Sequence, residues 1–549
     1  MSPGRPGHRA PLLWLLLPFM AGLAAGRIFD APPALLVALA ALVAGAAVPL
    51  AWTPQPAAHG AWPLAFALAV ALGGMAYFHL RLNRLAAWSA LPPREARLTL
   101  RVERAFTPPP EGKRTSGFAV VTQADAHLRD VINQRLYFSL NLPPTAMPPL
   151  RTSEILAVGV LAPLTRQARS GSFDEYIANA GMTFKFTRGR WLGDAAPPSR
   201  YARFCQTAEQ RFHAILGAGL TDRPALAAIL RAMMLGQKQE MSEDQQELFM
   251  HSGTMHLFAI SGLNITAIAL SMQILLTLLR LPRLAAAAVS LAALWLYVEV
   301  TGSSPSAVRA FLMCAVFIAS FSLRRPSNAL AALATSALLI LLIEPMQLFS
   351  ASFQMSYGIV TVLLLLGLPL TEALQARWPL FASLPEAAWG RPRRVIAGLW
   401  RGFLGMVGIG LATALVSTLS TIQFFQLLTP GSLAINLVLI PISTLVIGAG
   451  FLSLLCGLVG CMAGSVLYNH AGALLAWSMD ILLRAAMSVP GVYRSAQFRA
   501  AWLGPAGHAA LLALCLAGYA WHWRRERGGF WPPFILVGLL LLFGVKLGA

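Results

Sequence analysis

The chain has 549 residues, of which 57% are hydrophobic and only 12% are charged. A soluble domain carries about 25% charged residues, so this composition excludes a soluble globular protein and indicates an integral membrane protein. The formal net charge of +20 fits the basic cytoplasmic loops of membrane proteins, and it is also compatible with a polyanionic partner such as nucleic acid.

Three apolar runs open the chain, at about 11–27, 32–52 and 61–81. Each is close to the ~20 residues that a membrane-spanning helix needs. The first run follows Arg5 and Arg9 and resembles a signal peptide, but two more apolar runs follow it with no soluble domain between them. We therefore interpret it as a retained membrane helix and predict N-terminal transmembrane helices over residues 1–91.

The sequence becomes polar between Pro92 and Asp194, where five segments alternate apolar and polar residues as strands do. The five segments are RLTLRVERAF, SGFAVVTQA, QRLYFSLNL, EILAVGVLAPL and TFKFTRGRWL. Turns rich in Pro, Gly and Asp separate them. This pattern predicts a small OB-like β-barrel over residues 92–198, inserted between the membrane segments.

Residues 199–252 contain the amphipathic stretch TAEQRFHAILGAGL and the charged stretch GQKQEMSEDQQELFMHSG. They predict amphipathic helices at the membrane interface, although a plain connector between two domains fits them as well. Residues 253–549 predict a transmembrane bundle of ten apolar runs, some of which could re-enter the membrane without crossing it. The runs lie at about 253–280, 284–301, 305–323, 328–343, 349–370, 396–422, 431–459, 464–488, 506–523 and 530–548.

Arginines in the loops between these runs indicate an orientation, because they gather in alternate loops that the positive-inside rule places in the cytoplasm. These arginines are Arg280, Arg283, Arg324, Arg325, Arg377, Arg391, Arg393, Arg394, Arg524, Arg525 and Arg527. With Arg5 and Arg9 also inside, three N-terminal helices put the β-domain outside, whereas Arg494 and Arg499 oppose this orientation. The predicted fold is a polytopic α-helical membrane protein with a small OB-like β-barrel inserted as an extracytoplasmic domain.

Four groups of polar residues lie within or beside the apolar runs. The first is HLFAISGLNITAIAL, in which His256 and Asn264 would lie about 80° apart on a continuous helix and could face one cavity. Ser261 and Gly262 could instead break the helix and expose backbone groups to a pathway. Ordinary hydrogen bonding between helices explains the same residues without any site.

The second group is VEVTGSSPSAVRAFLM. Ser303 or Ser304 is suited to cap the helix that follows, with Pro305 in its first turn. A helix N-terminus attracts phosphate, and Arg309 about one turn later would strengthen that attraction. The alternative is an ion pair between Glu299 and Arg309 that only joins two helices.

The third and fourth groups are EPMQLFSASFQMSYGI, with Ser352, Gln354 and Ser356, and TIQFFQLLTPGSLAINLVLIPISTL, with Gln423, Gln426 and Asn436. Each alone fits helix-joining residues, whereas four such helices in one bundle favour a translocation path. No phosphate loop, HExxH, GxSxG or metal-ligand cluster occurs, and the five cysteines form no CxxC or Cys/His pattern. We therefore predict no cofactor, no metal site, no nucleotide motor and no enzymatic activity.

These segments and their order resemble the ComEC family, the bacterial competence proteins that pass single-stranded DNA through the cytoplasmic membrane. HLFAISGLN is similar to the family's H-L-(L/F)-A-I-S-G-L-H, and TGSSPSAVRA to its T-G-x-x-P-S-x-x-R-A. EPMQLFSASFQMSY resembles its element from D-P to F-Q-L-S-F, and NLVLIP its N-x-x-x-x-P. SGSFDEYIANAGMTFKF resembles the link at the end of the family's OB-like domain, so the resemblance covers essentially the whole chain.

Two features depart from the family. Asn264 stands where the family usually has His, so a titrating imidazole is missing there while hydrogen bonding remains available. Many family members continue into a metallo-β-lactamase-like domain thought to degrade the non-transported strand, and this sequence stops at Ala549 without it. We expect a naturally short protein, a separate nuclease, or a sequence taken from a longer protein.

The resemblance implies a channel for single-stranded DNA in the bacterial cytoplasmic (inner) membrane, used in natural transformation. Implied partners are single-stranded DNA, membrane lipid, a DNA receptor on the outer side, a cytoplasmic ATPase or helicase, and a separate nuclease. Candidate residues of the path in the membrane are His256, Ser261, Asn264, Ser304, Ser306, Arg309, Gln354 and Asn436. Candidate DNA contacts on the OB-like domain are Arg101, Arg104, Tyr137, Phe138, Lys185, Arg188 and Arg190, although solubilising surface charge also explains the basic ones.

Two other functions stay open at this point. One is a membrane enzyme or small-solute transporter that shares only the ancestry of the bundle, with His256 and Ser261 as base and nucleophile. Their spacing puts these two side chains about 140° apart on a regular helix, which opposes direct contact. The other is a scaffold that has lost transport.

Overall fold

The computed structural model describes residues 10–52, 56–82, 92–106, 114–143, 148–164, 172–260, 262–323, 328–381, 389–524 and 528–548. The chain divides into two compact units. The first consists of Met1–Thr207 and Ala334–Ser350, and the second of Ala208–Leu333 and Ala351–Ala549.

The first unit begins with the three predicted apolar helices. They are α2 (Leu13–Ile28), α3 (Pro33–Trp52) and α4 (Pro56–Leu82). α4 packs against both of the others. Glycines allow the close contact between α4 and α2. A Cβ atom on Gly22 would collide with the carbonyl oxygen of Ala71, and a Cβ atom on Gly74 would lie 2.7 Å from the carbonyl oxygen of Phe19. Such close backbone approach is typical of helix pairs in membranes.

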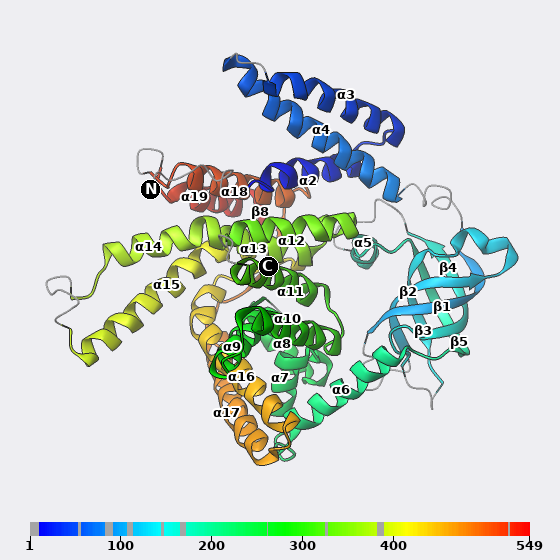
Figure 1. The fold of residues 1–549 in the computed structure, drawn as a ribbon. Coiled ribbons are helices and arrows are strands. Elements are labelled where there is room, and N and C mark those ends of the chain that lie inside the picture. The colour runs from blue at the N-terminus through cyan, green and yellow to red at the C-terminus, as the bar shows by residue number, and fades with distance from the viewer. Residues whose placement is uncertain are drawn as a thin grey trace. The chain divides into compact units, whose positions relative to one another are not determined.

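The predicted β-barrel is confirmed in the first unit (Figure 1). Its strands are β1 (Arg94–Phe106), β2 (Arg114–Ala124), β3 (Arg135–Asn141), β4 (Glu154–Pro163) and β5 (Phe184–Ala196). The closed order is β1-β2-β3-β5-β4, with β4 pairing back onto β1 and β5 running parallel to β3. Alternating side chains fill the interior, among them the fully buried Leu98, Leu136 and Phe186. The arrangement fits an OB-like fold.

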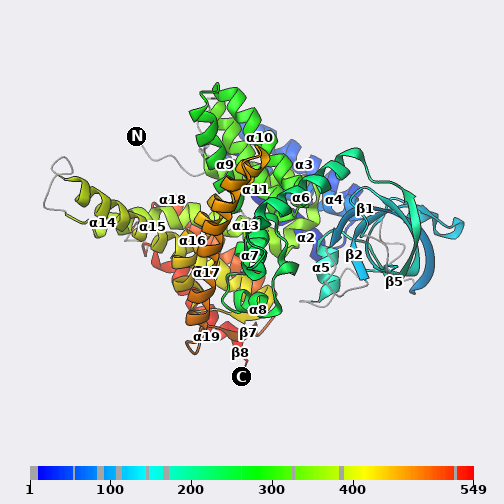
Figure 2. The ribbon, with the colours of Figure 1, turned by 90° about the horizontal axis from the view of Figure 1, so that it is seen from below.

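Two short helices accompany the barrel, η2 (Ala126–Val131) and α5 (Phe173–Asn179). Figures 1 and 2 both show α5 beside the barrel strands. Ile177 anchors α5, because it is fully buried in a small apolar cluster with Phe118 and Met182. The first unit also includes most of α12 (Ala329–Ile343) and all of η5 (Pro345–Phe349).

Helices cover the ten apolar runs predicted after residue 253, and all of them except most of α12 belong to the second unit. They are α9 (Gly262–Leu278), α10 (Arg283–Val300), α11 (Pro305–Ser322), α12, α13 (Ala351–Val362) with α14 (Leu368–Arg377), α15 (Arg391–Ser420), α16 (Ser432–Leu458), α17 (Met462–Met487), α18 (Leu503–Ala520) and α19 (Trp531–Gly544). Two π-helical segments extend these helices: η6 (Leu363–Gly367) joins α13 to α14, and η8 (Thr421–Phe425) follows α15. Three short strands were not predicted, and they form a sheet of β6 (Leu427–Leu428), β7 (Arg494–Phe498) and β8 (Val545–Leu547).

The run predicted over 253–280 is not one helix. α8 (Glu243–His251) ends before it, the 3-10 turn η4 (Met255–Phe258) follows, and α9 begins only at Gly262. Gly253, with φ of +73°, turns the chain between α8 and η4. The helix break that Ser261 and Gly262 suggested is therefore confirmed in its position, although Ser261 itself lies outside the described residues.

The amphipathic segment before the bundle contains α6 (Arg200–Gly217) and α7 (Pro224–Leu235), with the turn η3 (Lys238–Glu240) after them. α7 is buried within the second unit. Its fully buried Ile229, Leu230 and Met233 belong to the same hydrophobic core as α9, α16 and α17. The helix is apolar on nearly all sides, so it can only be stable inside a bundle.

Eight helices in the described part of the chain are long and apolar enough to cross a membrane. Their spans are Pro33–Trp52, Ala61–Arg81, Arg283–Val300, Pro305–Ser322, Ala351–Arg377, Arg391–Phe425, Ser432–Leu458 and Leu503–Ala520. Shorter apolar helices, such as α2, α12 and α19, accompany them. The protein is therefore a multi-pass membrane protein of the predicted fold class.

Candidate functional site

The start of α11 is built as the sequence predicts. Ser304 caps the helix, because its hydroxyl accepts a hydrogen bond from the backbone N–H of Ala307 at 3.3 Å. Pro305 occupies the first turn. Ser306 Oγ lies 3.2 Å from Ser304 Oγ. Two hydroxyl groups and the positive end of the helix dipole therefore meet at this point.

Arg309 lies about one turn further along α11 and is only 1% exposed. Its Nη2 donates to the backbone oxygen of Ser352 at 2.8 Å and also to the Ser352 hydroxyl. Its Nε is buried without a hydrogen-bond partner among the described residues. The alternative, an ion pair between Arg309 and Glu299, is not formed: the Glu299 carboxylate accepts a hydrogen bond from Ser303 Oγ at 2.7 Å, and Arg309 donates to Ser352.

The partner of Arg309 connects two of the polar groups found in the sequence. Ser352 stands at the exposed start of α13, in the third group, and Arg309 belongs to the second. Neutral oxygens alone contact the guanidinium within the described ranges, so no carboxylate there neutralises its charge. The pairing joins residues 43 positions apart, and no local pattern could have indicated it.

Asn264 forms a hydrogen bond with the C-terminal end of α7. Its buried Nδ2 donates to the backbone oxygen of Met233 at 2.8 Å. The hydroxyl of Tyr297, on α10, donates to the next carbonyl, that of Met234. The last carbonyls of a helix have no partner within the helix, so these two side chains satisfy the C-terminal end of α7, where Gly236 closes it with φ of +74°.

His256 and Asn264 do not share one helix, so the angle of about 80° that a continuous helix would give does not apply. His256 lies in η4, where its exposed ring places Nδ1 3.1 Å from the backbone oxygen of Gly253. Asn264 lies in the first turn of α9. Ser261 lies outside the described residues, so the structure does not test the alternative in which it acts as a nucleophile beside His256.

Two other predicted path residues lie on separate helices of the bundle. Gln354 is half-buried on α13, two residues after Ser352. Asn436 lies on α16, and its Oδ1 is buried without a hydrogen-bond donor among the described residues. An amide oxygen without a donor is costly in an apolar surrounding, which makes Asn436 a place where a polar ligand or water would be favourable.

The predicted DNA contacts on the barrel separate by exposure. Arg101, Arg188 and Arg190 are exposed, and Arg104, Tyr137 and Lys185 are half-buried on the outer face. Phe138 faces the other way and is fully buried in the barrel core, because successive residues of a strand point to opposite faces. The prediction that Phe138 contacts DNA is therefore wrong.

Comparison with known proteins identifies the origin of this bundle. A sequence model described as competence protein matches residues 233–525, which is more than half of the chain. The chain belongs to the ComEC family of competence proteins. Over 142 residues it is 30% identical to "ComE operon protein 3" of Bacillus subtilis (strain 168). That alignment covers 26% of this chain and 18% of the relative, so less than a fifth of the relative's length is matched. No solved structure matches the chain.

In this ComEC-family chain, the segment between α12 and α13, residues 344–350, belongs to the same unit as the barrel and is called the elbow. Glu344 begins the elbow, and Arg135 of β3 donates to its carboxylate at 2.5 Å while also pairing with Glu103 at 2.9 Å. Burial raises the pKa of the Glu344 carboxyl, and the Arg135 guanidinium offsets part of that rise. At Arg135 burial lowers the pKa of the guanidinium, but the carboxylates of Glu344 and Glu103 together outweigh burial and raise that pKa.

Three further side chains bind the elbow. Arg81 of α4 donates to the backbone oxygen of Ile343 at 2.6 Å. Asn179 of α5 donates to the backbone oxygen of Phe349 at 3.2 Å, and Arg27 lies over the Phe349 ring at 4.4 Å. Sequence reasoning missed this anchoring, although the Glu-Pro pair that opens the elbow was part of a polar group that it had found.

Gly181 tests how much the elbow depends on the Glu344 contact. A Cβ at Gly181 would lie 2.5 Å from Glu344 Oε1, and its φ of +84° already disfavours other residues. We expect Gly181→Ala to lower stability by about 2–3 kcal/mol, against about 1–2 kcal/mol for left-handed strain alone. Gly491→Ala is the matched control, because Gly491 has φ of +88° and a Cβ there would meet nothing within 4 Å among the described residues. Equal shifts in thermal unfolding, measured in detergent, would contradict the contact.

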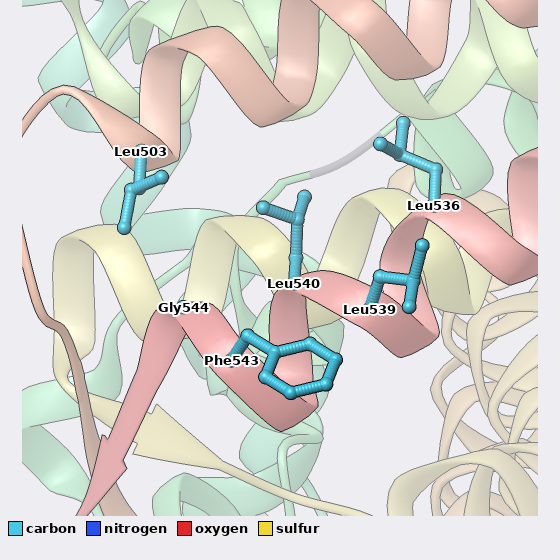
Figure 3. A pocket seen from close by; sticks show the side chains of 6 residues that line it. All are labelled: Leu503, Leu536, Leu539, Leu540, Phe543 and Gly544. Atoms are coloured by element: carbon cyan, nitrogen blue, oxygen red, sulfur yellow. The ribbon is translucent and has the colours of Figure 1, made fainter.

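Two other features of the described bundle present no positive charge to a polyanion. Asn469 is fully buried and donates to the backbone oxygens of Ile215 and Ala218 at 2.7 and 2.9 Å, which ties α17 to α6. A groove between α18 and α19 is lined by apolar side chains alone (Figure 3). Within the described ranges, no group of three His, Cys, Asp or Glu side chains is placed to hold a metal ion.

Proposed function

We propose that this chain is a channel for single-stranded DNA in the bacterial cytoplasmic membrane, active in natural transformation and without catalytic activity of its own. Membership of the competence family supports a role in DNA uptake. The channel role goes beyond that membership and is inferred from the bundle.

Arg309 is the observation that carries this proposal. A buried arginine in an apolar bundle is costly and marks a functional position by default. Here its guanidinium donates hydrogen bonds to the oxygens of Ser352, beside the capped start of α11. A phosphate that passes the start of α11 would be attracted by this buried cation, which no described carboxylate neutralises, and by hydroxyl groups that release it readily.

The proposal includes an orientation and partners. The arginine-rich loops favour placing the barrel on the outer side of the membrane, where it would receive the strand from a DNA receptor. Movement into the cell would need a cytoplasmic ATPase or helicase, and degradation of the other strand would need a nuclease. Asn436, Gln354, His256 and Asn264 remain proposed members of the path or of its walls, as do Ser261, Ser304 and Ser306.

Deletion of the chromosomal gene tests the proposal directly. We expect transformation by a selectable linear fragment to fall to the frequency of spontaneous mutants, and wild-type protein to restore it. Electroporation of the same fragment is the control, because it bypasses uptake and should work equally in both strains. Normal transformation in the deletion strain would refute the uptake role, and equal failure by electroporation would place the defect after entry.

A further inference from the structure

A row of four side chains crosses the outer face of the barrel. In the strand register Arg104 of β1 pairs with Phe118 of β2, Phe118 with Tyr137 of β3, and Tyr137 with Lys185 of β5. Neighbouring strands lie about 4.8 Å apart, so the row is about 14 Å long. Cationic side chains stand at both ends, and aromatic rings stand between them.

A β-bulge creates one end of this row. Val102 of β1 is buried in the barrel core, so strict alternation would also turn residue 104 inward. The register of β1 on β2 shifts between Val102 and Arg104, and Ala105 packs against the core in its place. The shift therefore brings Arg104 to the outer face, as bulges commonly re-aim a side chain at a binding surface.

Helix α5 adds two exposed rings to the row. The ring of Phe173 meets that of Tyr137 edge to face at 5.0 Å, and Tyr176 lies 6.1 Å from Phe173 with the two planes only 28° apart. Phe173 is 49% exposed and Tyr176 is 56% exposed. The buried Ile177 anchors α5 on the barrel, so both rings are fixed in place while about half of each stays exposed.

The charges around the rings favour an anionic ligand. Lys185 lies 5.7 Å from the centre of the Phe173 ring, and Arg104 lies over Phe106 at 5.5 Å with no ion pair to a described carboxylate. The two carboxylates on α5 already have cations: Asp174 pairs with Lys185 at 2.7 Å, and Glu175 with Arg27 at 3.8 Å. Accessible ring faces between cations are what a single strand with unpaired bases recognises.

We propose that Phe173 and Tyr176, together with Tyr137, form a base-stacking platform for single-stranded DNA, with Arg104 contacting a phosphate at one end of the row. This inference rests on the proposed uptake function and assigns its first contact on the barrel. The ligand is a single strand, because stacking on these rings needs bases that are not paired within a duplex.

The test uses the purified full chain in detergent and a fluorescein-labelled oligo(dT), with anisotropy measured across a salt series. We expect Phe173→Ala and Tyr176→Ala each to weaken binding about tenfold, since one base stack is worth about 1–3 kcal/mol. Their slopes of log affinity against log salt should stay unchanged. Arg104→Gln should instead lower that slope by about 0.7, the share of one phosphate on a single strand.

Three controls make the result decisive. Leu192→Ala removes a side chain on β5 that is 48% exposed and should leave affinity unchanged. Phe173→Trp and Tyr176→Trp keep a ring and should retain binding, which excludes misfolding as the cause of a loss. Duplex DNA of the same length should bind equally to wild type and to the alanine variants.

Unchanged oligo(dT) affinity in the double variant Phe173→Ala/Tyr176→Ala would overturn the platform. The platform would also be overturned if the double variant bound oligo(dT) normally but was less abundant in membranes, because that result is expected of rings that contact lipid. These outcomes are distinct from failure of the uptake role, which is decided by transformation of the deletion strain.

Discussion

Arg309→Ala is expected to lower transformation by at least about a hundredfold when it replaces the wild-type protein. The substitution removes two hydrogen bonds from a charged donor to Ser352, each worth about 1.5–3 kcal/mol. It also removes the one buried cation beside the start of α11 in the described bundle. The measurement is transformation frequency, normalised to protein abundance in the membrane by immunoblot.

Two more variants separate charge from anchoring. Arg309→Met keeps length and apolar packing but loses the charge, whereas Arg309→Lys keeps the charge on a shorter, single-headed side chain. A role in phosphate contact predicts that Lys retains more transformation than Met. Ser352→Ala, which removes only one of the two acceptors, should cost about tenfold.

Arg484→Ala is the matched control, because Arg484 is exposed on α17 and pairs with Asp480 within its own helix. It should transform as the wild type does. If Arg309→Ala transforms as well as the wild type, the phosphate role is contradicted. If Arg309→Met and Arg309→Lys lower the transformation frequency equally, anchoring of α13 is the sole function of this residue.

Asn264→Asp is expected to destabilise the bundle more than any other substitution of the same size. The change is nearly isosteric, but it replaces the Nδ2 donor with a carboxylate oxygen that faces the Met233 carbonyl in a buried site. A buried carboxylate oxygen that faces a carbonyl oxygen is repelled by it and costs several kcal/mol. Asn264→Ala should cost about 1–3 kcal/mol, since it leaves that carbonyl unsatisfied.

Thermal unfolding of the purified variants, followed by tryptophan fluorescence, measures both effects. Thr277→Ala on the same helix is the control, because its hydroxyl bonds only to Gln273 one turn earlier and is exposed. Asn264→His restores a donor and should unfold close to the wild type. An Asp variant as stable as the wild type would show that the bond to Met233 contributes nothing.

The helices and the barrel could be predicted because their signals are local. Apolar runs long enough to span a membrane and strict alternation in segments such as QRLYFSLNL need no knowledge of distant residues. The cap of α11 was equally local, since Ser304 and Pro305 are adjacent to the helix that they begin.

The contacts that define the site were not local. Arg309 and Ser352 lie 43 positions apart, and Arg135 and Glu344 lie 209 apart. The bulge that turns Arg104 outward could not be predicted from the alternation of apolar and polar residues in β1, because Ala105 is small enough to face either side. Phe138 was misassigned for a related reason: the sequence marks two faces of a strand, but only closure of the barrel decides which one is inside.

The first unit is discontinuous in the sequence, and this constrains how it is made. Its barrel and N-terminal helices leave the ribosome before roughly 130 residues of the second unit, and Ala334–Ser350 follows only then. At about 5–20 residues per second this delay is about 6–25 s. During that time Arg135, Arg81 and Asn179 have no elbow to bind. The barrel must therefore be stable by its own core first, and the elbow closes the unit as a late step of membrane insertion.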